Sequence, residues 1–174
     1  MKVSLIYKPE ERELVLMKRC IWATVNETRK PKNMPSSRLL HDVLRARHSP
    51  IRVLNYAFLI EDIPSNIATH LARHVHATPF VGSLRNDRQD VMDGDKAPRD
   101  TPVSMIYYVN AEELQVIANK RLCNKASAKT REVVKMMCDE AILATPELEG
   151  LLVPMCERCG GVCHEIDSCG RCSK

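Results

Sequence analysis

The stretch LARHVHATPFVGSLR, residues 71–85, ends an expected helix and enters the loop that follows it. It places Arg73 and His74 at the helix end, with Ser83 and Arg85 a little further along the chain. Arginine, histidine and serine side chains at such a junction can hold a phosphate group and orient a base. Plain exposure, or a favourable interaction with the helix dipole, is the alternative explanation for basic residues here. The stretch therefore predicts a candidate phosphate site.

Hydrophobic periodicity on both sides of this stretch predicts a mixed α/β protein. The pattern predicts strands at 2–7, 53–60 and 103–109, and helices at 11–25, 38–47, 64–75, 110–123 and 128–144. Ser65 is expected to cap the third helix after Pro64, with Val75 on its apolar stripe. Asn110 should cap the fourth, with Glu113 as reciprocal partner. The polar run 82–102 predicts a long loop, of a length that is usually functional or mobile.

Length and composition indicate one soluble globular domain. The 174 residues are 44% hydrophobic and 28% charged, which suits a single core. No apolar run approaches the length of a membrane span, and the N-terminus turns acidic within its first ten residues, unlike a signal peptide. We therefore expect a cytoplasmic protein without a membrane partner.

The net charge of +4 is modest, but its distribution is uneven. Residues 28–52 carry seven Lys or Arg residues and one acid, Asp42. This segment could meet phosphates, or it could form a solvated basic face. One Trp and two Phe give little surface for stacking bases, so no DNA or RNA polymer is expected as a partner.

Several landmarks in register with residues 71–85 make the chain resemble the flavin-dependent thymidylate synthases. That family carries Arg-His-Arg, seven residues, Ser, and another Arg two residues later; Arg73, His74, Ser83 and Arg85 match. The other landmarks are His48-Ser49-Pro50, the strand Tyr56–Ile60, Asn110-Ala111, Arg121, and the tail motifs Pro154-Met155-Cys156, Gly161-Val162-Cys163 and Ser168-Cys169-Gly170. The resemblance covers nearly the whole chain in order.

The resemblance implies a fold and an activity. The fold would be α+β, a mainly antiparallel sheet packed with long helices, assembled as a homotetramer with active sites between subunits. The activity would be reductive methylation of C5 of dUMP to give dTMP. Flavin adenine dinucleotide (FAD) would be the cofactor, methylene-tetrahydrofolate the carbon donor and NADPH the reductant. No side-chain nucleophile is required, because the flavin carries the redox chemistry and the protein supplies orientation and electrostatics.

The resemblance also implies roles for individual residues. The nucleotide-binding positions are His70, Arg73, Ser83, Arg85, Arg99 and Arg121, and of these Ser83 and Arg121 are the catalytic positions. The flavin-side positions are His48, Arg73, His74 and Asn110. A dianionic phosphate favours several guanidinium groups, which fits the number of arginines in the first set.

The chain departs from the family pattern mostly on the flavin side. The departures are Val75, Val81, Gly82, Asn86, Glu112, Val116 and Ala126–Lys129. Glu112 stands where an Arg faces the flavin phosphates, and an acid there would repel them. The nucleotide site is therefore expected to be better retained than the flavin site. Two alternatives stay open: a changed C5 chemistry such as pyrimidine hydroxymethylation, or a nucleotide-binding protein without catalysis.

The C-terminus is rich in cysteine. Five of the eight cysteines lie in the last 19 residues, whereas Cys20, Cys123 and Cys138 are scattered and are expected to be buried. We expect residues 1–150 to form the catalytic domain and residues 151–174 a Cys-rich tail. Paired Cys-x-x-Cys motifs predict a structural zinc ion held by Cys156, Cys159, Cys169 and Cys172. A redox pair and a free-thiol tail are the alternatives. His70 and His74, four residues apart, could also chelate a metal, but a nucleotide role or exposure is favoured.

Overall fold

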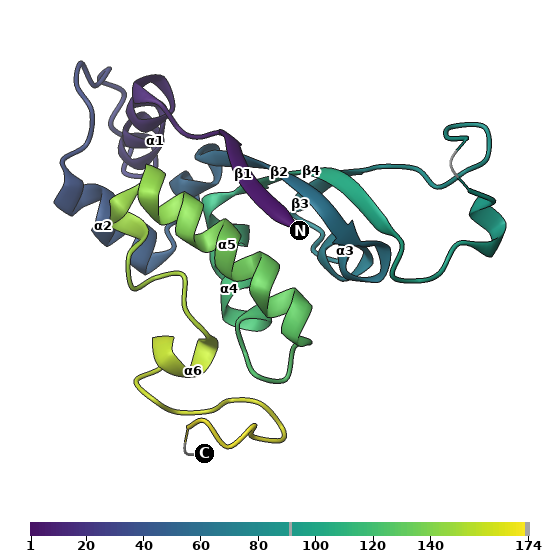
Figure 1. Ribbon diagram of the computed structural model, residues 1–174. Coiled ribbons are helices and arrows are strands. Elements are labelled where there is room, and N and C mark those ends of the chain that lie inside the picture. Colours follow the sequence, from purple (N-terminus) through teal and green to yellow (C-terminus); the bar gives the residue numbers. More distant parts are fainter. Residues whose placement is uncertain (91, 173–174) are drawn as a thin grey trace.

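The computed structural model describes residues 1–90 and 92–172. Its centre is a four-stranded sheet in the order β1-β2-β4-β3, in which every pair of neighbours is antiparallel (Figure 1). The strands are β1 Lys2–Tyr7, β2 Asn55–Pro64, β3 Ala77–Val81 and β4 Pro102–Asn110. The helices are α1 Glu11–Ala23, α2 Ser37–Ala46, α3 Ser65–Ala72, α4 Ala111–Arg121, α5 Ala128–Ala144 and α6 Met155–Arg158. Short 3-10 helices occupy Ser49–Val53, Gly94–Lys96 and Pro146–Leu148. The expected α+β fold is confirmed.

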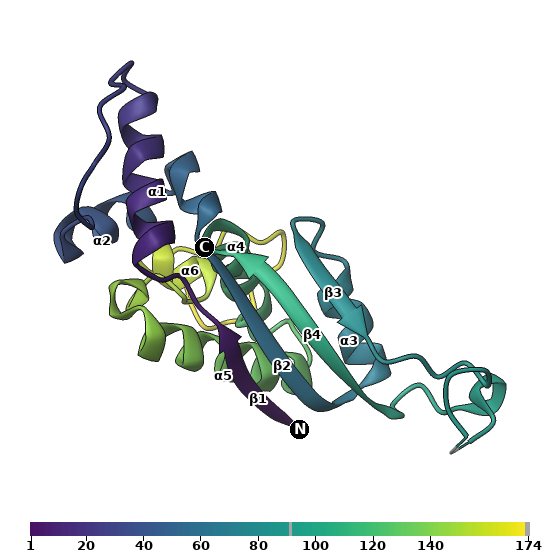
Figure 2. The same ribbon diagram turned by 90° about the horizontal axis from the view of Figure 1, so that it is seen from above.

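Strand β4 shows how the sheet divides the molecule. Its residues alternate between exposed and buried from Pro102 to Val109, because successive side chains of a strand point to opposite faces. Helices α3, α4 and α5 cover the buried face (Figures 1 and 2). Tyr107 and Met105 of β4 join Phe58 of β2 in the core on this side. In the part of the chain that the structure describes, no helix layer covers the opposite face of the sheet (Figures 1 and 2).

Strand β3 was not expected from the sequence. Pro79 lies at its centre and has no N–H to give to a ladder, which argues against a strand. The strand pairs only with β4, from Ala77 opposite Val109 to Val81 opposite Met105, so it is the edge of the sheet. An edge strand tolerates proline because one side of its backbone needs no partner.

Two local expectations at α3 were wrong, and one at α4 holds only in part. Helix α3 ends at Ala72, so Val75 is not on its apolar stripe but is 84% exposed. Ser65 does not cap α3; its hydroxyl donates to the Arg99 carbonyl over 2.8 Å. The cap of α4 is half as expected, since the Asn110 side chain accepts a hydrogen bond from the Glu113 N–H over 2.9 Å, but the Glu113 carboxylate bonds elsewhere.

The expected loop after β3 is confirmed. The loop segments 82–90 and 92–101 extend away from the body of the molecule in both views, and the second leads into β4 (Figure 2). Of the scattered cysteines, Cys138 is buried as expected, whereas Cys20 and Cys123 are only half-buried. In residues 1–90 and 92–172, no helix combines the length and the apolar character needed to cross a membrane.

Candidate anion-binding site

A small cavity lies along α3. It has a volume of about 170 Å³. Its lining residues are Ser65, Asn66, Thr69, His70, Arg73 and Arg99. The five that belong to α3 and its end share one face, because residues three and four apart in a helix are neighbours. Arg99 comes from the far end of the long loop, where its carbonyl accepts hydrogen bonds from the Ser65 hydroxyl and, over 3.0 Å, from the Asn66 N–H.

The composition of this cavity suits an anion. Two guanidinium groups, an imidazole and an amide line it, beside two hydroxyls whose protons are donated to the Arg99 and Ser65 carbonyls, and no carboxylate is among its lining residues. Guanidinium groups match the geometry of phosphate oxygens with paired N–H donors. The cavity thus brings together three of the residues expected to bind a nucleotide, His70, Arg73 and Arg99.

Arg121 reaches the same helix from α4. Its guanidinium donates from Nε to His74 Nε2 over 3.0 Å and, at 3.4 Å, to the carbonyl of His70. His74 is held on its other side, where Nδ1 lies 3.0 Å from Glu113 Oε1. The three side chains form a continuous hydrogen-bonded row, Glu113 to His74 to Arg121, that runs from α4 to the end of α3 and back.

The protonation of His74 follows from this row. An ionised Glu113 can only accept, so Nδ1 carries the proton and Nε2 is free to accept from Arg121. Burial lowers the pKa of His74 and outweighs the hydrogen bond to Glu113, which raises it; the positive charge of Arg121 lowers it further. A neutral imidazole is therefore the form that fits both partners, and it fixes the plane of the Arg121 guanidinium.

The N-terminal end of α4 holds Asn110, one of the four residues expected on the flavin side, whereas Arg73 and His74 lie at the end of α3. Asn110 caps the helix, and His48 is exposed at the start of the 3-10 helix that packs against α4. Glu112, which was expected to repel phosphates, forms an ion pair with Arg52: two guanidinium nitrogens face its two carboxylate oxygens. The negative charge at this helix end is thus locally balanced, and the Arg52 side chain is 61% exposed.

Ser83 and Arg85 lie on the long loop. The Arg85 guanidinium makes a paired interaction with the Asp87 carboxylate, at 2.9 and 2.8 Å, and the Ser83 hydroxyl accepts from the Arg85 N–H. In the described part of the chain, neither side chain forms a hydrogen bond or an ion pair with Arg73, Arg99 or Arg121. Among the described residues, the lining of the α3 cavity includes neither Ser83 nor Arg85, and Arg121 lies next to it without lining it.

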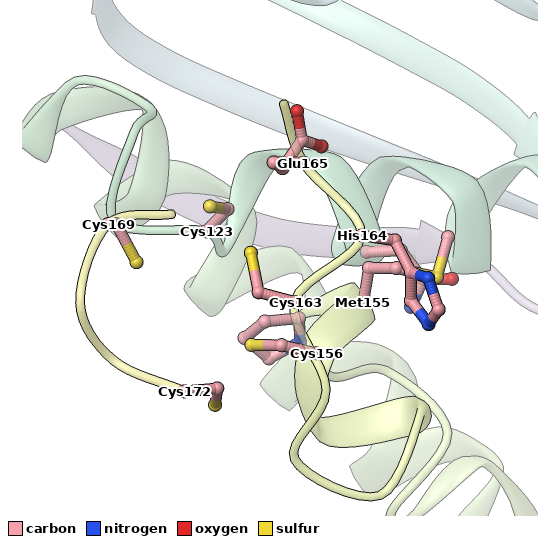
Figure 3. A pocket seen from close by; sticks show the side chains of 10 residues that line it. Cys123, Met155, Cys156, Cys163, His164, Glu165, Cys169 and Cys172 are labelled. Carbon is pink, nitrogen blue, oxygen red and sulfur yellow. The ribbon is translucent and has the colours of Figure 1, made fainter. Parts of the chain in front are cut away.

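The cysteine tail differs from the expected zinc set. Five cysteines line one cavity beside the end of α4, and Figure 3 shows their side chains together with His164: Cys123, Cys156, Cys163, Cys169 and Cys172. Cys159 is not among them, because it lies on the side of α6 near Arg47 and Arg158. Among residues 1–90 and 92–172, no group of three or more His, Cys, Asp or Glu side chains meets at a point where it could hold a metal. Both ring nitrogens of His74 already have partners, Glu113 and Arg121.

Sequence reasoning missed several members of these sites. The α3 cavity residues Asn66 and Thr69 carry no motif, although their helical spacing from Arg73 could have placed them on its face. Glu113 was read only as a capping residue, and nothing in the sequence joins it to His74 across the 39 positions between them. Arg52 was counted within a basic segment, without a partner.

Comparison with known proteins places this geometry on a known fold. No family model and no curated protein matches the chain. Thymidylate synthase ThyX from Helicobacter pylori, in two crystal structures with FAD and dUMP, has TM-scores of 0.64 and 0.66 at 18% identity, covering 80% of this chain and 93% of that chain. The UMP/dUMP methylase PolB from Streptomyces cacaoi, bound to 5-Br dUMP, has a TM-score of 0.67 at 14% identity, covering 86% and 93%.

The class is thus that of the α+β proteins built like flavin-dependent thymidylate synthases. The chain has the ThyX fold, shared with a UMP/dUMP methylase, at a sequence distance that marks it as divergent. The resemblance seen in the sequence is confirmed at the level of the fold.

Proposed function

We propose that the protein binds dUMP or a closely related pyrimidine nucleotide, and that it methylates the base at C5 as a flavin-dependent thymidylate synthase. Methylene-tetrahydrofolate would supply the carbon and NADPH the reducing equivalents. The observation that carries the proposal is the α3 cavity with His70, Arg73 and Arg99, next to a guanidinium of Arg121 that a buried row holds in place. This cluster lies on a fold whose solved relatives hold dUMP or 5-Br dUMP.

In this proposal the nucleotide phosphate lies against Arg73 and Arg99, and Arg121 adds a third guanidinium. The His74 imidazole keeps Arg121 oriented, so the phosphate meets a preorganised donor. Ser83 contributes a hydroxyl, and with Arg121 it is the residue expected to act on the reacting nucleotide. The protein's part in the reaction is to bind, orient and exclude water.

The flavin would lie by the N-terminal end of α4. Asn110 caps this end, His48 begins the 3-10 helix that packs against α4, and the pairing of Glu112 with Arg52 removes the repulsion that an isolated carboxylate would exert on phosphates. The His74 side chain is only 9% exposed, so little more than the edge of its ring could contact a flavin. When bound, the flavin supplies the redox chemistry of the methyl transfer. Because Arg52 balances the charge of Glu112, this helix end is more compatible with the phosphates of a dinucleotide than the sequence alone indicated.

A homotetramer would complete the site. Ser83 and Arg85 lie on the long loop and are not among the residues that line the α3 cavity, so they could serve a neighbouring subunit. The open face of the sheet also needs cover. Phe80, Ile106 and Leu59 are adjacent across three strands, and Phe80 is 61% and Ile106 39% exposed. Apolar side chains gathered on a bare sheet mark protein contact surfaces. Light scattering that finds a monomer at micromolar concentration would contradict this part.

A second candidate function is C5 methylation that also accepts UMP, and the likeness to a UMP/dUMP methylase favours it. Other altered C5 chemistry, such as hydroxymethylation, and binding without catalysis are the further alternatives. In this proposal the α3 cavity contacts only the phosphate, which dUMP and UMP share, so it would accept either nucleotide.

Visible absorbance of the purified protein and nucleotide titration test the proposal. We expect flavin absorbance, tighter binding of dUMP than of deoxyuridine, and a product in which a methyl group replaces the C5 hydrogen, so that its mass exceeds that of the substrate by one CH2 unit. Comparison of UMP with dUMP decides between the two candidates. A colourless protein that takes up no FAD, or equal affinity for deoxyuridine and dUMP, would remove the proposal.

A further inference from the structure

The C-terminal tail is attached to the body at α6. The Arg158 guanidinium donates to Gln115 Oε1 over 3.0 Å and to the Arg45 carbonyl over 2.8 Å, and Asn119 donates to the Val153 carbonyl over 2.6 Å. Cys156 of α6 is buried. Beyond it, from Glu157 to Cys172, no side chain is buried. A segment that buries so little apolar surface needs another source of order, such as a metal ion or a covalent link.

Polar contacts alone do not supply that order. Lys120 pairs with Glu165 over 3.1 Å, and Lys125 donates to the Asp167 carbonyl over 2.9 Å. Arg171 pairs with Glu157. All these side chains are solvent-accessible, and exposed ion pairs contribute only about 0.2–1 kcal/mol each. These contacts place the tail beside the end of α4, but they are too weak to hold the loop 160–172 in one conformation.

The thiols, in contrast, face a shared cavity. Figure 3 shows the sulfur atoms of Cys156, Cys163, Cys169 and Cys172 arranged around it. The cavity has a volume of about 20 Å³. That is room for roughly one water-sized particle, so the cavity suits a single ion and is too small for an organic ligand.

We propose that Cys156, Cys163, Cys169 and Cys172 bind one structural Zn²⁺ ion that closes the tail onto α6. Four thiolates are a preferred tetrahedral ligand set for zinc, at about 2.3 Å from the ion. The four sulfur atoms surround the cavity without meeting at one point, so binding draws the loop 160–172 inward. Gly161 and Gly170, at φ of +91° and +82°, form the turns that let this loop close.

The donor set differs from the paired Cys-x-x-Cys motifs of the sequence. Cys163 takes the place of Cys159, which has Arg47 and Arg158 as its charged neighbours outside the cavity. Cys123 is a near neighbour from the end of α4, two positions after Arg121. The ion would therefore brace the tail against the helix end that carries Arg121. All four proposed zinc ligands belong to the tail, so the zinc site can be tested independently of the proposed function.

Metal content of the full chain, purified reduced and without chelator, tests the site. We expect about one zinc per chain. In a competition with a chromogenic chelator, Cys163→Ser should weaken zinc binding at least about tenfold, as should Cys169→Ser. Cys159→Ser and Cys138→Ser are the matched controls and should retain zinc. Replacement of zinc by Co²⁺ should give the intense thiolate charge-transfer absorption and the visible bands of a tetrahedral tetrathiolate site, which needs no variant.

Three results would overturn the proposal. The first is a reduced chain that neither contains zinc nor binds added Zn²⁺ at micromolar concentration. The second is loss of zinc in Cys159→Ser together with its retention in Cys163→Ser, which would restore the paired motifs. The third is tail cysteines found as disulfides by mass spectrometry in protein that still has its fold by circular dichroism, which would make the cluster a redox pair.

Discussion

His74 Nδ1 lies 3.0 Å from Glu113 Oε1, and both side chains are less than 10% exposed, at 9% and 8%. A buried carboxylate lowers the stability of the fold unless hydrogen-bond partners compensate for its lost hydration. The Glu113 carboxylate therefore depends on its hydrogen bond to His74. Its effect reaches the surface through Arg121, which donates to the opposite nitrogen of the same ring. A residue expected only to cap α4 thus orients a residue expected to bind phosphate.

Replacing Glu113 should show this coupling. Glu113→Leu leaves the His74 Nδ1–H without an acceptor in a buried site, which should lower the free energy of unfolding by about 1–3 kcal/mol. Glu113→Gln keeps an acceptor oxygen and should lose less. Urea unfolding measures the difference, with Glu132→Leu on the exposed side of α5 as control. Equal stability of the Leu and Gln variants would show that the carboxylate does not hold His74.

Acid should weaken the fold through His74. Burial lowers its pKa in the folded state below the usual 6.5, so between these two values the unfolded chain binds a proton that the folded chain does not. The contribution is fully present above about pH 6.5 and is lost as the pH falls towards the folded value. From about pH 7.5 to about pH 5, the Tm of wild type should fall further than that of His74→Gln. Parallel curves for the two proteins would contradict this.

The sequence predicted the fold where one pattern dominates locally. Helices α1, α2, α4 and α5 carry long apolar stripes and were placed within a few residues. Strand β3 was missed because a proline such as Pro79 is compatible with a strand only at the edge of a sheet. The edge position of β3 follows from its pairing with β4, which the local sequence does not reveal.

The sites, too, could be predicted only where the sequence carries a recognisable local pattern. His70, Arg73 and Arg99 were identified through a resemblance and meet in one cavity, although 26 positions separate the last two. The Glu113–His74 and Arg52–Glu112 pairs were not foreseen, because each joins distant segments and neither has a local pattern. For Glu112 this changes the interpretation. The sequence alone indicates a carboxylate that repels phosphates, whereas in the structure Arg52 balances its charge.

That pairing predicts a charge effect on the flavin. Arg52→Ala should leave the Glu112 carboxylate unpaired at the end of α4 and weaken FAD binding by up to about fivefold, as expected for an exposed pair. Adding Glu112→Gln to Arg52→Ala should restore most of the loss. Flavin fluorescence titration at low and high salt measures both, and the difference should shrink in high salt. An unchanged affinity in the single variant would mean that the flavin lies elsewhere.

Arg121 and Arg73 should carry much of the nucleotide affinity. A charge-assisted hydrogen bond contributes about 1.5–3 kcal/mol, so Arg121→Ala should weaken dUMP binding roughly tenfold to a hundredfold. Arg73→Lys should lose part of the affinity, since an ammonium cannot reproduce a paired guanidinium contact. Isothermal titration measures both, and deoxyuridine binding should stay nearly constant. If Arg121→Ala binds dUMP as wild type does, the basic segment 29–52 becomes the next phosphate candidate.

The long loop offers a matched pair for testing whether subunits share a site. Arg85 and Arg88 are similarly exposed, at 71% and 66%, and both pair with Asp87. Only Arg85 is expected to reach a nucleotide, in the cavity of a neighbouring subunit, with Ser83 beside it. Arg85→Ala should therefore weaken dUMP binding about tenfold, Ser83→Ala less, and Arg88→Ala hardly at all. The titrations belong at a concentration where light scattering shows a tetramer, because dissociation should abolish the difference. Equal losses in Arg85→Ala and Arg88→Ala would mean that the loop acts only through its general positive charge.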